Sequence, residues 1–288
     1  MEYTVRDVTI YYEIYGSGMP VFMIHGWSPD HRLMKGCMEP IFQSMDKPWK
    51  RIYFDLPGMG RTKGKPWITG SDQMLDVIFE FIDGIIPNQH FVVAGESYGG
   101  YLARGLINRR SAMIDGLLLI CPLKAPYVIT ADGVWKGDVP EFRVLEQDQS
   151  LLQSLSKKDR EQFEAITVLQ NTRVWARFRE EILPGLNVAD TEFLENSLGK
   201  NVPFSFDVDL FDRPYMKPTL MLMGRQDSAV GYRDIWHIIE NYPRASFVIL
   251  DKAGHNLQIE QDVLFNEIVK EWLSRVLEET CEFSKQRV

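Results

Sequence analysis

Residues 95–99 read Gly95-Glu96-Ser97-Tyr98-Gly99, and they stand between two different apolar patterns. The run at 90–94 before them is typical of a buried strand, and the stretch 98–108 after them is typical of a helix. A serine between a strand and a helix stands on a sharp turn, where its hydroxyl is exposed at the helix N-terminus. Flanking glycines let the strand and the helix approach closely. This context predicts a nucleophilic serine at position 97, and the alternative is a serine that only caps the helix.

Strand and helix patterns alternate on both sides of this turn. Apolar runs typical of strands lie at residues 8–15, 21–24, 51–55, 116–120, 219–223 and 247–250. A helical stripe follows Ser71, which we expect to be its N-cap, and a terminal helix carries Val263 to Val276. Alternating strands and helices build a parallel sheet from βαβ units. We therefore expect an α/β fold with a mostly parallel sheet and helices on both of its faces.

The alternation stops between Pro122 and Lys217. In this segment the apolar spacing is helical, no run typical of a parallel strand occurs, and prolines divide the chain into short pieces. Because the strand patterns on both sides belong to one sheet, the segment interrupts one domain rather than separating two. We predict one core domain of residues 1–121 and 218–288, with residues 122–217 inserted as a helical cap.

Composition narrows the possible partners. The 288 residues are 45% hydrophobic and 25% charged, as in ordinary globular proteins, and the net charge is −8. An acidic chain does not attract nucleic acid or an anionic membrane, and no run reaches the roughly 18 apolar residues that span a bilayer. Three widely spaced cysteines form no metal-ligand pattern. We expect a small-molecule substrate, no metal and no cofactor, a cytoplasmic location, and a monomer or homodimer.

A serine hydroxyl becomes a good nucleophile when an imidazole accepts its proton. Of the five histidines, His255 follows the last strand, at the carboxyl end of the sheet, where ligands meet open α/β folds. His90 opens a strand and His237 lies inside a predicted helix, so both are expected to be structural. His31 is expected in a solvated polar loop. We predict that His255 is the general base.

A carboxylate is needed to orient the histidine and stabilise its charged form. Asp227 lies just past the carboxyl end of the preceding strand, so it is expected at the same edge of the sheet as Ser97 and His255. Asp251 is the rival, but it is close to His255 in the chain and suits a turn equally well. We favour Asp227.

The tetrahedral intermediate of acyl transfer needs two hydrogen-bond donors for its oxyanion. The backbone amide of Tyr98, directly after the nucleophile, is the natural first donor. The second is expected from the loop after the strand at 21–24, and we assign it to the amide of Trp27. His25 in that loop is expected to order the loop rather than to act as a base.

Together these stretches resemble the α/β-hydrolase superfamily. The matching residues are His25-Gly26-Trp27, Asp55 to Gly60, Gly95 to Gly100, Asp227 and Gly254-His255, in the family's order. The resemblance implies an eight-stranded, mostly parallel sheet with a lid after the sixth strand, and an esterase-like serine hydrolase. Serine at the nucleophile position counts against dehalogenases and epoxide hydrolases, which carry aspartate there.

The predicted reaction is hydrolysis of an ester or related acyl bond of a small molecule through an acyl-enzyme. Carbon–carbon bond hydrolases, aminopeptidases and low-turnover receptors share the fold and stay open as alternatives. In the cap, Trp135, Trp175 and Phe178 are predicted to line an apolar pocket, although packing between cap helices explains such residues equally well. Arg173 and Arg177 could grip a carboxylate, but an exposed salt-bridging face is favoured.

Overall fold

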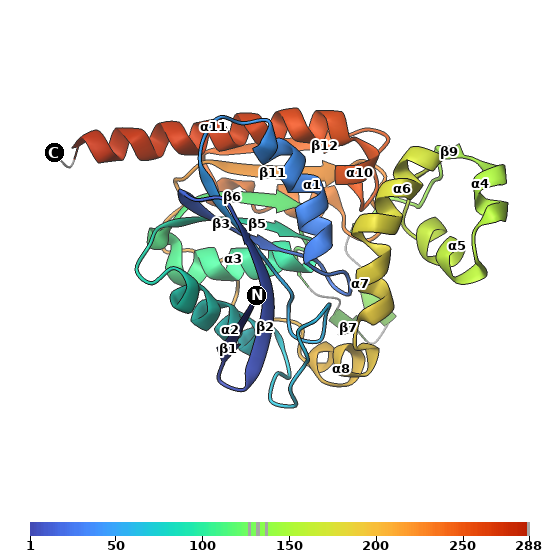
Figure 1. The fold of residues 1–288 in the computed structure, drawn as a ribbon, viewed down its shortest axis with the longest axis horizontal. Coiled ribbons are helices and arrows are strands. Elements are labelled where there is room, and N and C mark those ends of the chain that lie inside the picture. The colour runs from blue at the N-terminus through green and yellow to red at the C-terminus, as the bar shows by residue number, and fades with distance from the viewer. Residues whose placement is uncertain (126–127, 131–132, 136–137, 287–288) are drawn as a thin grey trace.

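The computed structural model of the chain describes residues 1–125, 128–130, 133–135 and 138–286 (Figure 1). Its main sheet has eight strands in the order β1-β2-β4-β3-β5-β6-β11-β12. Their bounds are β1 Glu2–Val5, β2 Val8–Tyr15, β3 Met19–Ile24, β4 Trp49–Phe54, β5 Phe91–Glu96, β6 Ile114–Ile120, β11 Thr219–Gly224 and β12 Ala245–Leu250. β2 runs antiparallel to β1 and β4, and the other neighbouring pairs are parallel. The predicted eight-stranded, mostly parallel sheet is confirmed.

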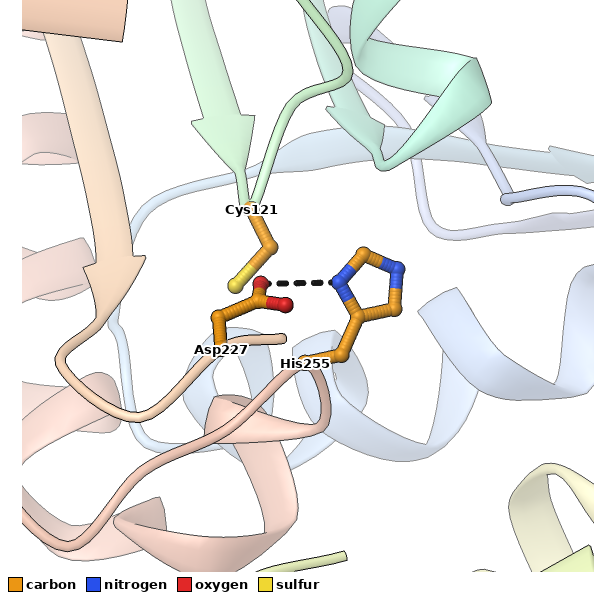
Figure 2. Close-up of side chains that lie close together, drawn as sticks. All are labelled: Cys121, Asp227 and His255. Carbon is orange, nitrogen blue, oxygen red and sulfur yellow. Dashed lines mark hydrogen bonds and ion pairs between the residues drawn. The ribbon is translucent and has the colours of Figure 1, made fainter. Parts of the chain in front are cut away.

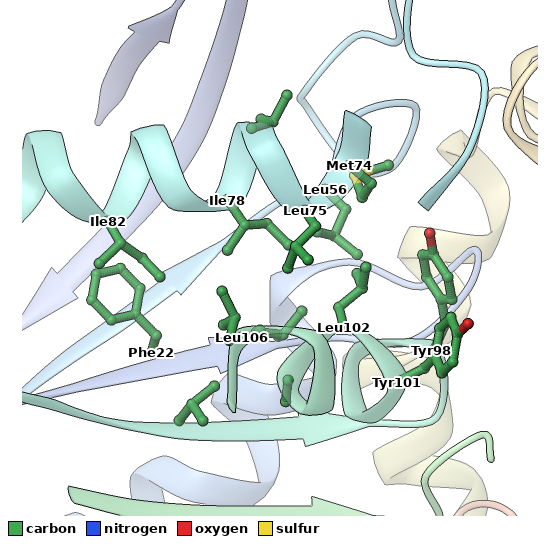
Figure 3. Close-up of a cluster of buried hydrophobic side chains, with 14 of the residues drawn as sticks. Phe22, Leu56, Met74, Leu75, Ile78, Ile82, Tyr98, Tyr101, Leu102 and Leu106 are labelled. Atoms are coloured by element: carbon green, nitrogen blue, oxygen red, sulfur yellow. The ribbon is translucent and has the colours of Figure 1, made fainter. Parts of the chain in front are cut away.

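Helices cover both faces of the sheet (Figure 1). α1 His31–Gln43 and α11 Asp262–Gln286 pack with one apolar cluster, and α2 Ser71–Ile85 and α3 Tyr98–Arg110 pack with the other. Successive side chains of a strand point to opposite faces, so β3 supplies Val21 and Met23 to the first cluster and Phe22 and Ile24 to the second. Figure 3 shows the second cluster, in which Ile82 of α2 lies next to Phe22 and Leu75 of α2 faces Leu102 of α3. The burial of β3 on both faces explains its unbroken apolar run.

Most of the chain between β6 and β11 lies beyond the carboxyl ends of these strands (Figure 1). Its last part returns along the core, where the Tyr215 hydroxyl donates to Ile114 O at the start of β6. Its elements are β7 Val128–Thr130, β8 Gly133–Trp135, β9 Glu146–Gln147, α4 Gln149–Ser154, α5 Lys157–Glu164, β10 Leu169–Gln170, α6 Thr172–Glu181, α7 Leu183–Val188 and α8 Thr191–Asn196. Helices α4 to α8 make up most of the residues in these elements, and the assignment of residues 122–217 as a cap stays a prediction. The antiparallel pair β7–β8 and the parallel two-residue pair β9–β10 were not expected. Strands this short carry too few residues to leave a pattern in the sequence.

Two local expectations near the N-terminal half are wrong. His31 does not lie in a solvated loop, because it begins α1 and is buried, with Nδ1 2.7 Å from Asp55 Oδ1. Pro40 lies inside this helix, and because proline disfavours a helix interior the sequence pattern does not predict a helix there. Ser71 is not an N-cap, because Gly70 occupies that position and the Ser71 hydroxyl lies 2.8 Å from the Tyr98 hydroxyl.

No helix in the described ranges combines the length and the apolar character needed to cross a membrane.

Candidate active site

Ser97 stands between β5 and α3 in the predicted strand–turn–helix arrangement. Its backbone angles are φ 52° and ψ −115°, a conformation that residues with a side chain rarely adopt. The turn is held by the Ser97 amide, which donates to Ile120 O at 2.9 Å, and by the Ser97 carbonyl, which accepts from Gly100 and Tyr101. The strained turn places Ser97 between β5 and α3 and outside both, which is the position that a nucleophilic serine needs.

Two glycines make this turn possible because backbones approach each other closely there. A Cβ atom on Gly95 would collide with the carbonyl oxygen of Gly99. A Cβ atom on Gly99 would collide in turn with the carbonyl oxygen of Ile24, at the end of β3. The spacing of glycines around Ser97 therefore reflects the packing of α3 against two strands.

His255 and Asp227 meet at the carboxyl edge of the sheet (Figure 2). His255 Nδ1 lies 2.8 Å from Asp227 Oδ2, and both residues are buried. Asp227 Oδ1 accepts the amides of Ala229 at 2.8 Å and Val230 at 2.9 Å, so the loop after β11 orients the carboxylate. Asp251 is exposed and accepts a hydrogen bond from the Gln226 side chain instead. The imidazole thus pairs with Asp227 and not with its rival.

The charges around the imidazole favour its protonated form. Burial lowers the pKa of His255, but the charge and hydrogen bond of Asp227, together with the charges of Glu96 and Glu260, outweigh burial and raise it to about 9. A base with a raised pKa holds a transferred proton firmly. Only the neutral imidazole accepts the serine proton, so a raised pKa moves the active form to higher pH.

Cys121 is the third side chain in Figure 2, and its sulfur could form a ligand set with Asp227 and His255 within 4.8 Å. Burial raises the pKa of the Cys121 thiol well above its usual range, and the charges of Asp227 and Glu96 act in the same direction. Metal binding needs a thiolate. We interpret Cys121 as a neutral buried neighbour of the pair, and the absence of a metal stays a prediction.

The loop after β3 holds Trp27, whose amide is the predicted second oxyanion donor. His25 orders this loop, as expected: its Nδ1 lies 2.8 Å from Gly26 O, and its Nε2 accepts the Leu56 amide at 3.0 Å. The Trp27 ring packs edge-on against Tyr98, with ring centroids 5.2 Å apart. Within the described ranges, the amides of Trp27 and Tyr98 make no hydrogen bond, so both are available to an oxyanion.

The Nε2 side of the imidazole holds a residue that we did not predict. Glu96 is buried, and its Oε1 lies 3.4 Å from His255 Nε2. In the part of the chain that the structure describes, the Ser97 hydroxyl makes no hydrogen bond, so the serine and the imidazole are not joined here. Hydrogen bonds between catalytic groups are often long before substrate binds. Only a carboxyl at the end of a buried strand hinted at this contact in the sequence.

Comparison with known proteins agrees with this geometry. A family model described as the alpha/beta hydrolase fold matches residues 19–262. The chain belongs to the α/β-hydrolase family. The chain is 30% identical to an alpha/beta superfamily hydrolase from Oenococcus oeni PSU-1, whose crystal structure superposes with a TM-score of 0.82, covering 96% of this chain and 99% of the other.

Two relatives of this α/β hydrolase carry the name pimeloyl-[acyl-carrier protein] methyl ester esterase. The Legionella pneumophila (strain Corby) protein is 25% identical, over 92% of this chain and all of its own length. The Aeromonas salmonicida (strain A449) protein is 28% identical, over 90% of this chain and 96% of its own. The predicted family, fold class and esterase-like character are confirmed.

The cap of this hydrolase is bound to the loop that carries His255, which we also did not predict. Glu260 is buried at the end of α10 Leu257–Glu260, and its Oε2 accepts the Gly254 amide at 2.6 Å. Its Oε1 accepts two cap amides, Val168 at 2.7 Å and Leu169 at 3.2 Å. One carboxyl therefore joins the residue before His255 to the cap.

Two arginines of α6 extend this attachment. Arg173 donates to the carbonyls of Ile259 and Glu260, and Arg177 donates to the carbonyl of Gln258. Both also form ion pairs, so the expected salt-bridging face exists in part. The expectation that it is exposed is wrong for Arg177, whose side chain is 22% exposed. The arginines satisfy the last carbonyls of α10, where a helix has no partners of its own.

The predicted pocket residues face different surroundings. Phe178 is fully buried and Trp175 nearly so, and each ring lies 5.2 Å from Phe163 of α5 between centroids. This favours packing between cap helices over contact with substrate, while the pocket role stays a prediction. Trp135 lies in β8, but its side chain is outside the described part of the structure.

Proposed function

We propose that Ser97, His255 and Asp227 form the catalytic triad with which this hydrolase cleaves an ester bond of a small molecule. The observation that carries the proposal is the 2.8 Å contact between His255 and Asp227, at the sheet edge where the strained Ser97 turn lies. The esterase names of the relatives support the class of bond. The cap of residues 122–217 is proposed to close this edge and to limit which substrates enter.

The geometry supports a two-step acyl transfer. His255 Nε2 takes the proton of the Ser97 hydroxyl as the oxygen attacks the ester carbonyl, and Asp227 stabilises the imidazolium that forms. The amides of Trp27 and Tyr98 bind the oxyanion. The imidazolium then protonates the leaving alcohol, and water hydrolyses the acyl-enzyme with His255 again as base. Each step uses groups of this chain and water only.

Methyl esters of acyl chains are the first substrates to test, because the named relatives act on such an ester. Carbon–carbon bond hydrolysis, aminopeptidase activity and a receptor role remain alternatives. Sustained turnover of esters with no turnover of aminoacyl anilides or dienol ketones would separate the esterase from the other enzymes. Burst release without turnover would favour the receptor.

Labelling with a fluorophosphonate, paired with hydrolysis of p-nitrophenyl and methyl esters, tests the triad. The wild type should be labelled and should turn over esters, and Ser97→Ala should do neither. Ser111→Ala, on an exposed turn remote from the site, is the matched control and should keep both properties. Labelling of Ser97→Ala at the wild-type rate would exclude Ser97 as the nucleophile.

We also propose a cytoplasmic monomer or homodimer that binds neither nucleic acid nor membranes. The net charge of −8 supports weak attraction to anionic polymers and lipids. Light scattering after size-exclusion chromatography measures the oligomeric state, and a larger assembly would contradict this proposal.

A further inference from the structure

The imidazole of His255 lies between two buried carboxyl groups that approach opposite nitrogens. Asp227 contacts Nδ1 at 2.8 Å, and Glu96 contacts Nε2 at 3.4 Å. The Glu96 side chain is 2% exposed and the Asp227 side chain is fully buried. Nε2 is the atom that must accept the serine proton, so Glu96 touches the reacting group directly.

We propose that Glu96 is a second catalytic carboxyl, which stabilises the His255 imidazolium at Nε2 while Asp227 stabilises it at Nδ1. This inference rests on the proposed triad, because it assigns Glu96 a part in the same proton transfer. It adds a residue whose side chain the triad scheme does not use.

The surroundings of Glu96 leave its carboxyl few other partners. A Cβ atom on Gly26 would collide with Glu96 Oε2, so the carboxyl packs directly against the loop after β3. The backbone of Gly26 lowers the pKa of Glu96 and so favours its charged form. A buried carboxyl without a charged or hydrogen-bonding partner would be strongly destabilising. The imidazole is the cation that faces it.

Titratable groups from several elements surround the pair of Glu96 and His255. Glu96 faces His255 and Asp227, while Glu260 adds a third carboxyl on the His255 side. Cys121 and Cys37 also sense the Glu96 charge, but burial raises the pKa of both thiols and keeps them neutral. The titration of the site is therefore that of one imidazole among three carboxyls.

The Glu96 carboxyl titrates in the range in which an esterase operates. Burial raises the pKa of Glu96 to about 7, the charge of His255 lowers it, and the charge of Asp227 raises it. Because Glu96 and His255 each shift the pKa of the other, the two groups titrate as a coupled pair. Removing the Glu96 charge destabilises the imidazolium, so neutral, active His255 should persist to lower pH.

The test is the pH dependence of kcat/KM for a neutral ester, together with the rate of fluorophosphonate labelling. Glu96→Gln keeps the shape of the side chain and removes its charge. The acid limb of the pH profile of kcat/KM should therefore move to lower pH by about one unit or more. Its plateau kcat should fall by up to about tenfold with little change in KM, because the base is weaker. Glu96→Asp keeps a carboxyl but holds it farther from the imidazole. The acid limb of its pH profile should lie between those of Glu96→Gln and the wild type.

The control is Glu39→Gln, which removes a partly buried carboxylate of α1 that pairs with Arg51 of β4. This variant should leave the acid limb in place. An unchanged acid limb in a folded Glu96→Gln protein would overturn the inference. If Glu96→Gln does not fold, NMR titration of His255 in the intact chain decides: two coupled steps support the pair, and a single step at the ordinary histidine pKa contradicts it.

These results separate the inference from the proposed triad. If Ser97→Ala remains active, the triad itself is wrong. If Ser97→Ala is inactive and Glu96→Gln follows the wild-type profile, the triad stands and only the role of Glu96 falls.

Discussion

The Ser97 turn and the cap attachment support the same site in different ways. The turn is built from backbone, with glycines that let strands and helix touch and amides that hold the serine in a strained conformation. The cap is attached by side chains, with Glu260, Arg173 and Arg177 binding backbone groups across the interface. A turn formed by backbone contacts needs particular residues next to one another, so it appears in the sequence as a contiguous motif. Side-chain attachment joins residues that are about 90 positions apart and leaves no motif.

The strongest test of the turn is Ser97→Ala. It removes the nucleophile and changes no backbone contact, so kcat should fall by up to about 10⁶-fold while the Tm stays within a few degrees of the wild type. Ester hydrolysis and thermal melting measure the two effects. A variant that loses its fold together with its activity would show that the hydroxyl also supports the turn.

Asp227→Asn tests the loop that orients the imidazole. An amide can accept the same backbone amides but favours the wrong imidazole tautomer, so kcat should fall by about 10⁴-fold. Wild-type kcat/KM should rise with pH through the raised pKa of His255, because only the neutral imidazole accepts a proton. Loss of the Asp227 charge should move that rise to lower pH. Asp251→Asn is the matched control, and an equal loss there would contradict the assignment.

Glu260→Gln tests whether the cap attachment matters for chemistry. The change replaces one acceptor with a donor that faces backbone amides, so the loop before His255 should shift. We expect kcat to fall about 10- to 100-fold with a lower Tm. Glu164→Gln, a cap carboxylate that pairs with Arg160 near the surface, should have little effect. A normal kcat with a lowered Tm would make Glu260 a structural support only.

Phe178→Ala and Trp175→Ala test the inside of the cap. Both rings pack on Phe163, so each variant should lose about 3 to 5 kcal/mol of unfolding free energy. The ratio of kcat/KM for long and short acyl esters should change less than about threefold, because the rings face other rings. A selective loss on long chains would restore the pocket role predicted from the sequence.

Chelation is expected to have the smallest effect. Two amides and three side chains supply the oxyanion binding and proton transfer of the proposed reaction, so EDTA should leave kcat/KM unchanged. Recovery of activity on adding a divalent cation to EDTA-treated protein would show that the Cys121, Asp227 and His255 group binds a metal.

Much of the site was predictable because the fold brings certain chain positions together. Loops that follow parallel strands meet at one edge of the sheet, so Ser97, Asp227 and His255 could be predicted at that edge without coordinates, and Asp227 and His255 do meet there. The same rule preferred Asp227 to Asp251. His31 was misplaced because a buried imidazole bonded to Asp55 has no local pattern, and Pro40 concealed the helix that it begins.

The sequence alone determined the sheet, the turn at Ser97 and the segment that interrupts the sheet, since each depends on periodicity or on residues that are adjacent in the chain. Only the tertiary structure decided that Glu96 faces His255, that Glu260 joins the cap to the His255 loop, and that Phe178 packs inward. These contacts depend on side-chain direction and on the approach of distant segments. A local pattern records which residues are apolar or small, and it does not record which atoms of a distant segment they will meet.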